Sequence, residues 1–132
     1  MQFQPEIPIY KQLIEEMKGM IISEVWQSGT KIPSVRELSQ TFGVSPNTMQ
    51  RALAELEQQG LLFAERTAGR YVTDNKELIC KLKKEQAFQI AAKSTHQLLT
   101  LGLNPTEIIE LVNLVFEKGE QHESDCNRNK SQ

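Results

Sequence analysis

The chain has 132 residues, 39% of them hydrophobic and 24% charged, a composition typical of one compact domain with room for a small oligomerisation element. Its 15 Lys and Arg residues against 17 Asp and Glu residues give a formal net charge of −2, which argues against a protein whose whole surface binds nucleic acid. There is no run of about 18 apolar residues, no signal-peptide pattern and no metal-site spacing of Cys80 and Cys126, so we expect a cytoplasmic protein with no membrane span, metal or cofactor.

The first predicted element is a helix that starts around Pro8, a residue that a first helical turn tolerates. Apolar side chains recur after it at steps of three and four residues, which places them on one face of the helix. They are Tyr10, Leu13, Ile14, Met17, Ile21 and Val25, with Ile22 and Trp26 widening the stripe. Ser28 and Gly29 are expected to end this helix.

A short helix is predicted next, beginning at a capping box. The Ser34 hydroxyl can accept the backbone N–H of Glu37, while the Glu37 carboxylate reaches back to the start of the helix. Val35, Leu38 and Phe42 face inward, and Gly43 ends the helix because glycine readily adopts the left-handed conformation.

The following helix begins only two residues later, with Ser45 as its cap and Pro46 at its first position. It runs to about Gln59 and ends at Gly60. Its apolar stripe consists of Met49, Ala52, Leu53 and Leu56. Two helices joined by such a short, glycine-containing turn are typical of a helix-turn-helix.

After Gly60 the pattern becomes that of a β-hairpin. Residues 61–66 and 70–73 are short β-prone runs on either side of residues 67–69 (TAG), which place a glycine at the turn. A helix-turn-helix followed directly by a hairpin is a winged helix. The predicted fold is therefore mostly α with a small β-hairpin, in which residues 1–74 form an N-terminal winged helix-turn-helix.

Residues 75–119 are predicted to form two apolar helices. The first is long and ends at Gly102, and the second begins at Asn104 and Pro105, is apolar around most of its circumference, and ends at Gly119. Two helices are too few to enclose a ligand pocket, but their exposed apolar faces would form an interface. We therefore expect this module to hold a homodimer together. Residues 120–132 have no periodicity and are predicted to be disordered.

The helix over residues 45–59 has one face suited to reading DNA. With its apolar stripe turned inward, the opposite face presents Asn47, Arg51, Ala54 and Gln58, with Gln50 on the flank. Amides and guanidinium groups pair bidentately with adenine and guanine edges. The helix N-terminus, with the hydroxyls of Ser45 and Thr48, suits a phosphate. The alternative is an ordinary solvated helix face, but the preceding helix, the tight turn and the hairpin favour DNA contact.

The distribution of charge supports this interpretation. Residues 28–51 hold three basic side chains and only one acidic one, and the hairpin adds Arg66 and Arg70. The first helix, by contrast, holds three acidic side chains against two basic ones, and residues 52–65 hold three acidic side chains and no basic one. The negative net charge is thus located away from the predicted DNA-binding surface.

Several motifs, in this order, resemble the DNA-binding domain of the GntR family over about residues 7–74. They are residues 31–38 (KIPSVREL), residues 43–53 (GVSPNTMQRAL), Leu56 with Gly60, and residues 69–72 (GRYV). The resemblance implies DNA contacts from Arg36, Ser45, Asn47, Thr48, Gln50 and Gly69. Family members with large effector domains often carry arginine where this chain has Pro46 and Gln50, and Thr67 replaces the first glycine of the wing. The complete predicted DNA-contacting set is Arg36, Ser45, Pro46, Asn47, Thr48, Gln50, Arg51, Arg66, Gly69 and Arg70, with no catalytic and no metal-binding residue.

The run Ser-Pro-Asn-Thr resembles the YtrA-like subgroup of that family. Its members have short two-helix C-terminal regions, often repress their own operons and often lie beside ABC transporter genes. The resemblance implies a sequence-specific transcriptional regulator, not an enzyme, that acts as a homodimeric repressor on a palindromic double-stranded DNA operator. The alternative function is a winged-helix module that binds protein and not DNA. No residue pattern identifies a small-molecule effector.

Overall fold

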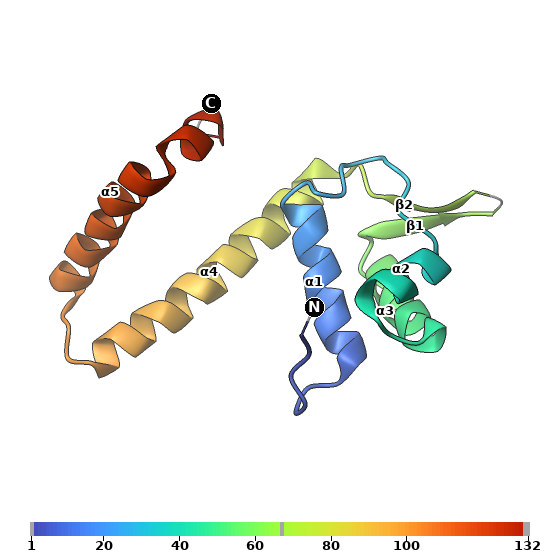
Figure 1. The fold of residues 1–132 in the computed structure, drawn as a ribbon, viewed down its shortest axis with the longest axis horizontal. Helices are drawn as coiled ribbons and strands as arrows, with labels where there is room; N and C mark the ends of the chain where they lie inside the picture. The colour runs from blue at the N-terminus through green and yellow to red at the C-terminus, as the bar shows by residue number, and fades with distance from the viewer. Residues whose placement is uncertain (1, 67, 131–132) are drawn as a thin grey trace. The chain divides into compact units, whose positions relative to one another are not determined.

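The computed structural model describes residues 2–66 and 68–130, with side chains described as far as Gly119. The chain divides into two compact units, Met1–Glu85 and Gln86–Gln132. In chain order its elements are α1 (Ile9–Ile22), α2 (Val35–Phe42), α3 (Pro46–Gln58), β1 (Leu62–Glu65), β2 (Gly69–Val72), α4 (Lys76–Thr100) and α5 (Pro105–Lys130) (Figure 1). The predicted fold class, mostly helical with one antiparallel hairpin, is confirmed.

The core of the N-terminal unit lies where α1, α3 and the hairpin meet. The largest fully buried side chains are Leu13, Met17 and Ile21 of α1, Met49, Leu53 and Leu56 of α3, and Leu61 and Val72 at the hairpin. The apolar stripe predicted for α3 is buried in full. Three residues in the first turns of α4 also pack against this core, namely Leu78, Ile79 and Leu82. The compact unit therefore extends beyond residue 74, into the start of α4.

The end of α1 differs from the prediction. The helix stops at Ile22, well before Ser28 and Gly29, because Glu24 adopts a left-handed conformation with a φ of 67°. Val25 is therefore 67% exposed and does not continue the apolar stripe. Trp26 instead packs half-buried against the core from the loop. The misplaced boundary has a simple cause: a glutamate performs the chain reversal that glycine usually performs.

The two helices of the helix-turn-helix begin and end as predicted. The Ser34 Oγ accepts the N–H of Glu37 at 3.1 Å, and the Glu37 carboxylate accepts the N–H of Ser34 at 3.1 Å. The bond from the Ser34 N–H to the carboxylate, with smaller contributions from the Ser34 hydroxyl and from Lys31, lowers the pKa of Glu37 below its usual value. Gly43 ends α2 with a φ of 70°. The Ser45 Oγ then accepts the N–H of Thr48 at 3.2 Å and caps α3.

The hairpin is joined by a third segment that the sequence did not reveal. β1 and β2 pair antiparallel, with Leu62 opposite Val72 and Phe63 opposite Tyr71. On the other side of β2, residues 29–32 run alongside it: the N–H of Ile32 donates to the Arg70 carbonyl at 3.0 Å, and the N–H of Val72 donates to the Thr30 carbonyl at 2.9 Å. The loop before α2 is therefore fixed to the wing.

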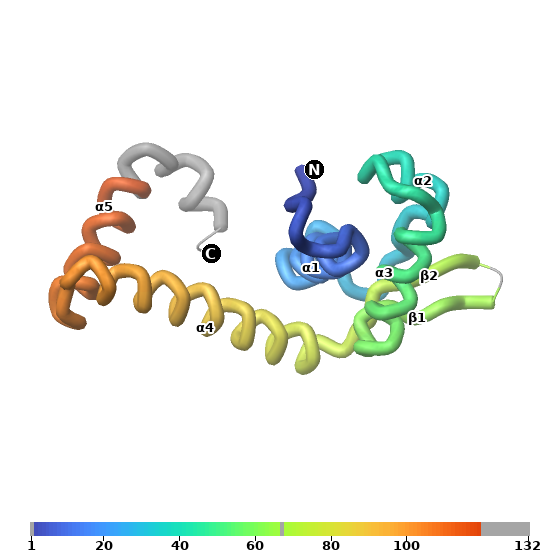
Figure 2. The backbone as a smooth tube through the Cα atoms, turned by 90° about the horizontal axis from the view of Figure 1, so that it is seen from below, coloured from blue at the N-terminus to red at the C-terminus, as the bar shows by residue number. Residues whose placement is uncertain are grey.

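The C-terminal unit consists of the rest of α4 and of α5, which Figure 2 shows as separate helices joined by a short turn. Gly102, with a φ of 99°, lies in that turn as predicted, and Asn104 and Glu107 exchange reciprocal hydrogen bonds of 3.0 and 2.8 Å that start α5. The prediction that the helix ends at Gly119 is wrong, because α5 continues to Lys130 and Gly119 has no positive φ. Residues 131–132 of the predicted tail lie outside the described residues.

Both C-terminal helices expose many large apolar side chains. The most exposed are Phe88, Ile90, Leu101, Ile109, Val115 and Phe116, each more than 60% accessible. Ile108, at 8% exposed, is the buried exception. No single helix of the described residues is long and apolar enough to span a membrane, although α4 and α5 taken together, as a bent pair, reach the necessary length and composition.

Candidate nucleic-acid interface

The outward face of α3 has the composition that the sequence predicted. Asn47, Gln50, Arg51 and Ala54 are exposed, while the apolar stripe on the other side of the helix is buried against the core. No acidic residue lies in the first turn of α3, and Glu55 and Glu57 follow only in its second half. These amide and guanidinium groups, of the type that pairs with base edges, thus project into solvent from a helix whose packing leaves little rotational freedom.

The N-terminus of α3 lies beside this face and supplies polar groups for a phosphate. Pro46 occupies the first helical position and exposes no N–H there. The hydroxyl oxygens of Ser45 and Thr48 lie 2.9 Å apart, so each already has a partner in the free protein. Arg36 projects from the first turn of α2 and is exposed. These groups lie on two helices that pack directly against each other.

The side chain of Arg51 is stacked on an aromatic ring. Its guanidinium carbon Cζ lies over the ring of Tyr10 from α1, 3.7 Å from the ring centroid. Tyr10 was predicted only as a member of the α1 core stripe, and the sequence did not indicate that it would meet a residue of α3.

Arg70 has a different environment from the one predicted for a DNA-contacting residue. Its Nε donates a hydrogen bond to a carboxylate oxygen of Glu57 in α3, and the two side chains are only 16% and 31% exposed. The pair ties β2 to the last turns of α3. Any contact from Arg70 to DNA has to come from its remaining Nη groups. The spacing of charges along the sequence could not reveal this pair, because its members belong to different elements.

The side chain of Lys31 lies beside the wing tip. Gly69 has a φ of 99°, and a Cβ at this position would lie 3.1 Å from Cε of Lys31. The lysine side chain therefore lies beside the first residue of β2, a position that neither its charge nor its place in the motif of residues 31–38 indicates. Arg66 is exposed beside the turn. Thr67, the departure from the family pattern at the wing, lies outside the described residues.

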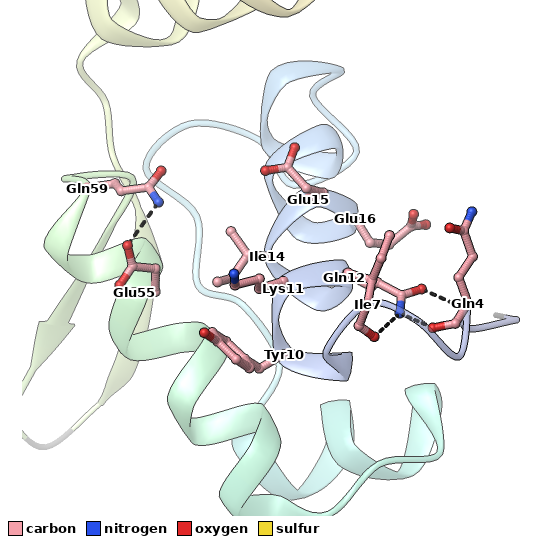
Figure 3. Close-up of a pocket in the computed structure, with 10 residues that line it drawn as sticks. All are labelled: Gln4, Ile7, Tyr10, Lys11, Gln12, Ile14, Glu15, Glu16, Glu55 and Gln59. Carbon is pink, nitrogen blue, oxygen red and sulfur yellow. Dashed lines mark hydrogen bonds between the residues drawn. The ribbon is translucent and has the colours of Figure 1, made fainter.

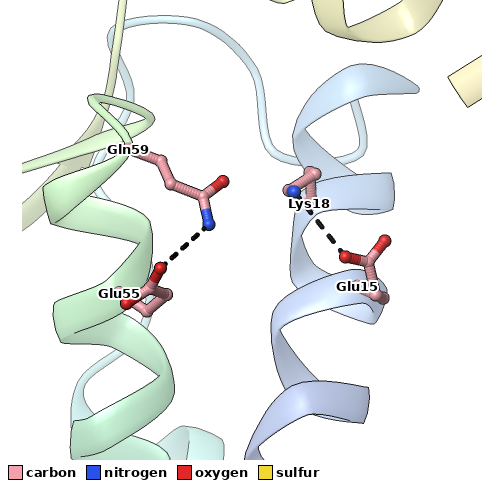
Figure 4. Close-up of polar contacts among 4 residues, drawn as sticks. All are labelled: Glu15, Lys18, Glu55 and Gln59. Atoms are coloured by element: carbon pink, nitrogen blue, oxygen red, sulfur yellow. Dashed lines mark hydrogen bonds and ion pairs between the residues drawn. The ribbon is translucent and has the colours of Figure 1, made fainter. Parts of the chain in front are cut away.

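An open groove of about 700 Å³ lies on the N-terminal unit, and its lining is acidic (Figure 3). Several of its polar members already have hydrogen-bond or ion-pair partners. Gln12 accepts the N–H of Gln4 at 2.8 Å and donates to the Gln4 and Ile7 carbonyls at 2.8 Å, which holds the N-terminal segment on α1. Figure 4 shows two further pairs, Glu55 with Gln59 and Glu15 with Lys18. With three glutamates in its lining, this groove does not suit a phosphate backbone.

No group of three or more metal-binding side chains occurs within the part of the chain that the structure describes. A capped helix-turn-helix with an exposed, acid-poor second helix and a hairpin beside it defines a winged-helix DNA-binding protein. Residues 9–72 match the family model described as "Bacterial regulatory proteins, gntR family". The chain belongs to the GntR family of bacterial transcriptional regulators.

Individual relatives extend this similarity along the chain. The protein is 30% identical over 118 residues to the uncharacterized HTH-type transcriptional regulator YhcF of Bacillus subtilis, covering 89% of this chain and 98% of YhcF. It is 40% identical over 68 residues to the HTH-type transcriptional repressor YtrA of the same organism, covering 52% of each chain. The similarity to YtrA therefore spans only about half of that repressor.

Solved structures agree with the family assignment. A GntR family transcriptional regulator from Listeria monocytogenes is 35% identical, with a TM-score of 0.78 over 86% of this chain and 99% of that one. The DNA-binding domain of AraR in complex with operator ORX1 is also 35% identical, with a TM-score of 0.52 over 55% of this chain and 93% of that one. The structure with operator covers the region of the winged helix alone.

The Glu57–Arg70 pair is expected to stabilise the wing. Because both side chains are largely buried, a double-mutant cycle with Glu57→Ala and Arg70→Ala should give a coupling of about 1–2 kcal/mol in urea unfolding. The pair Glu15 and Lys18, 3.6 Å apart on α1, is the control: the Glu15 side chain is 65% exposed, so solvent screens the pair and it should couple by less than about 0.5 kcal/mol. Equal coupling in the two cycles would contradict a structural role for Arg70.

Gly69→Ala is expected to destabilise the protein by about 1–3 kcal/mol, because the positive φ strains any residue with a Cβ and the new methyl displaces Lys31. Gly19→Ala is the control with the opposite expected sign. Gly19 lies inside α1 with ordinary helical geometry and open space around it, so alanine should stabilise the protein by about 0.5–1 kcal/mol. Thermal unfolding of both variants measures the difference.

Proposed function

We propose that this GntR-family regulator is a repressor that binds a palindromic operator as a homodimer. The observation that supports operator recognition best is the exposed, acid-poor face of α3, with Asn47, Gln50 and Arg51 projecting into solvent. Within a family of DNA-binding regulators, that face is the part of the chain best suited to enter a major groove.

The residues divide into two roles. Asn47 and Gln50 carry amides that pair with adenine, and Arg51 carries a guanidinium that pairs with guanine. Arg36, Ser45, Thr48 and the start of α3 are placed to hold phosphates, which fixes the position of the helix along the duplex. The wing adds Arg66, Gly69 and the neighbouring Lys31, while Arg70 is held partly by Glu57. Pro46 occupies the first position of α3, where its ring fixes the backbone φ.

The exposed apolar faces of α4 and α5 support dimerisation through residues 75–119. A soluble chain rarely exposes so many large apolar side chains unless they meet a partner, and a second copy of the chain is the simplest partner. Two symmetry-related recognition helices would then read half-sites about 34–36 Å apart, or a multiple of one DNA turn. Repression would follow from occupying DNA that RNA polymerase needs.

The similarity to named repressors supports repression, and not activation, as the direction of regulation. YtrA and NagR of Bacillus subtilis are both named as transcriptional repressors, and each matches this chain over part of its own length. We infer that the protein acts in the cytoplasm, that it is not an enzyme, and that its own operon is the first target to test. The competing function, a winged helix that binds only protein, does not require an acid-poor face on α3.

Binding to the DNA upstream of the protein's own gene is expected to weaken steeply with salt. Each phosphate neutralised by Lys or Arg releases counterions, so log Kobs should fall linearly with log salt concentration, by about 0.9 per contact. Fluorescence anisotropy with a labelled fragment measures this slope. A flat salt profile, or no binding at low salt, would contradict the proposed function.

Asn47→Ala and Arg51→Ala should each lose about 1–3 kcal/mol of operator affinity, with a smaller loss on random DNA, if they contact bases. Arg36→Ala should weaken binding to both DNAs, because a phosphate contact does not depend on sequence. The control is Lys18→Ala, which removes a positive charge on α1 near the C-terminal end of α3 (Figure 4). Lys18→Ala should bind as the wild type does. Equal losses on both DNAs for Asn47 and Arg51 would show phosphate contact only.

Dimerisation can be tested on the exposed apolar residues directly. Val115→Glu combined with Phe116→Glu should convert a dimer to a monomer in sedimentation, because each change places a charge on the proposed interface. Operator affinity should then fall sharply while the winged helix still unfolds cooperatively. Finding the wild type as a monomer at micromolar concentration would contradict this part of the proposal.

A further inference from the structure

The contact between Tyr10 and Arg51 joins a core helix to the DNA-reading face. Tyr10 lies at the start of α1, is half-buried and packs against the hydrophobic core, so its ring is held in place. Arg51 is exposed on α3, and its Cζ lies 3.7 Å from the centre of that ring. At this distance the guanidinium and the face of the ring are in van der Waals contact, within the range of a cation–π interaction.

Arg51 differs from Arg70 in what holds it. Arg70 gives its Nε to a carboxylate, whereas Arg51 forms no ion pair with any described residue. A contact made through Cζ and the ring leaves the N–H donors at the edge of the guanidinium available. The ring therefore restricts where the guanidinium lies without using the groups that would bond to DNA.

We propose that Tyr10 is a positioning residue for DNA recognition, which holds the Arg51 guanidinium ready to contact the operator. This inference rests on the proposed function of Arg51 as a DNA contact. A long arginine side chain loses conformational freedom when it binds, and a side chain already held in one place loses less. The aromatic face is what matters, so the Tyr10 hydroxyl is not required.

A double-mutant cycle on operator binding tests the role of Tyr10. The full chain is prepared as wild type, Tyr10→Leu, Tyr10→Phe, Arg51→Ala and Tyr10→Leu with Arg51→Ala, and each is titrated against the same upstream DNA fragment. Tyr10→Leu should weaken binding about two- to fivefold when Arg51 is present and should have no effect when Arg51 is alanine. Tyr10→Phe should bind as the wild type does, because it retains the ring.

Two results of this cycle would overturn the proposal. One is an equal loss from Tyr10→Leu in both backgrounds, which would mean that Tyr10 acts through the general packing of α1. The other is a loss from Tyr10→Phe as large as that from Tyr10→Leu, which would assign the effect to the hydroxyl. Thermal unfolding of each variant shows whether the winged helix is still folded.

The contact itself can be measured without DNA and without any variant. In the free wild-type protein, NMR should show the side-chain protons of Arg51 shifted upfield by the ring current of Tyr10. Absence of that shift would overturn the inference and leave the proposed function standing. A present shift in a protein that binds no fragment in a salt-dependent manner would overturn the proposed function, and the role of Tyr10 in recognition with it.

Discussion

The burial of the α3 apolar stripe against α1 is the interaction on which the rest of the N-terminal unit depends. Met49, Leu53 and Leu56 are fully buried, and together they fix the rotation of α3 about its own axis. That rotation decides which side chains face solvent, because residues on opposite sides of a helix cannot both be buried in one core. The presentation of Asn47 and Gln50 is therefore a consequence of hydrophobic packing, although neither side chain takes part in it. Neither α2 nor α3 is long enough to be stable alone, so the face proposed to read DNA exists only in the packed unit.

Features encoded by neighbouring residues could be predicted from the sequence. The Ser34 capping box, the Gly43 turn and the buried stripe of α3 follow from spacings of a few residues, and the structure confirms each of them. The end of α1 was missed because Glu24 takes a conformation that glycine usually takes. Contacts between distant residues were also missed: the pairing of residues 29–32 with β2, the Glu57–Arg70 pair and the stacking of Arg51 on Tyr10. Each depends on how the elements pack, which local spacing does not encode. The set of DNA-contacting residues stays a prediction.

The two units of the chain differ in how far they bury their apolar residues. The winged helix buries its own stripes in a core of its own, whereas the helices α4 and α5 leave many large apolar side chains in solvent. In the proposed dimer, burial of these side chains requires the second copy, so the stability of the C-terminal unit would be coupled to association. The N-terminal unit has no such dependence. Three glutamates line the groove beside α1, whereas exposed basic side chains occur on α2, α3 and the wing.

The pairing of residues 29–32 with β2 also affects which surfaces of the molecule can associate with another chain. Because β2 is hydrogen-bonded on both sides, the edges of this small sheet are β1 and residues 29–32, and β1 is the regular strand of the two. That edge is four residues long and ends in Glu65, and short, charged edge strands are poor templates for pairing with a foreign strand. The edge of the sheet is thus a poor site for pairing with another chain, whereas the apolar faces of α4 and α5 are accessible. The proposed self-association therefore involves the exposed faces of the helices and not the edge of the sheet.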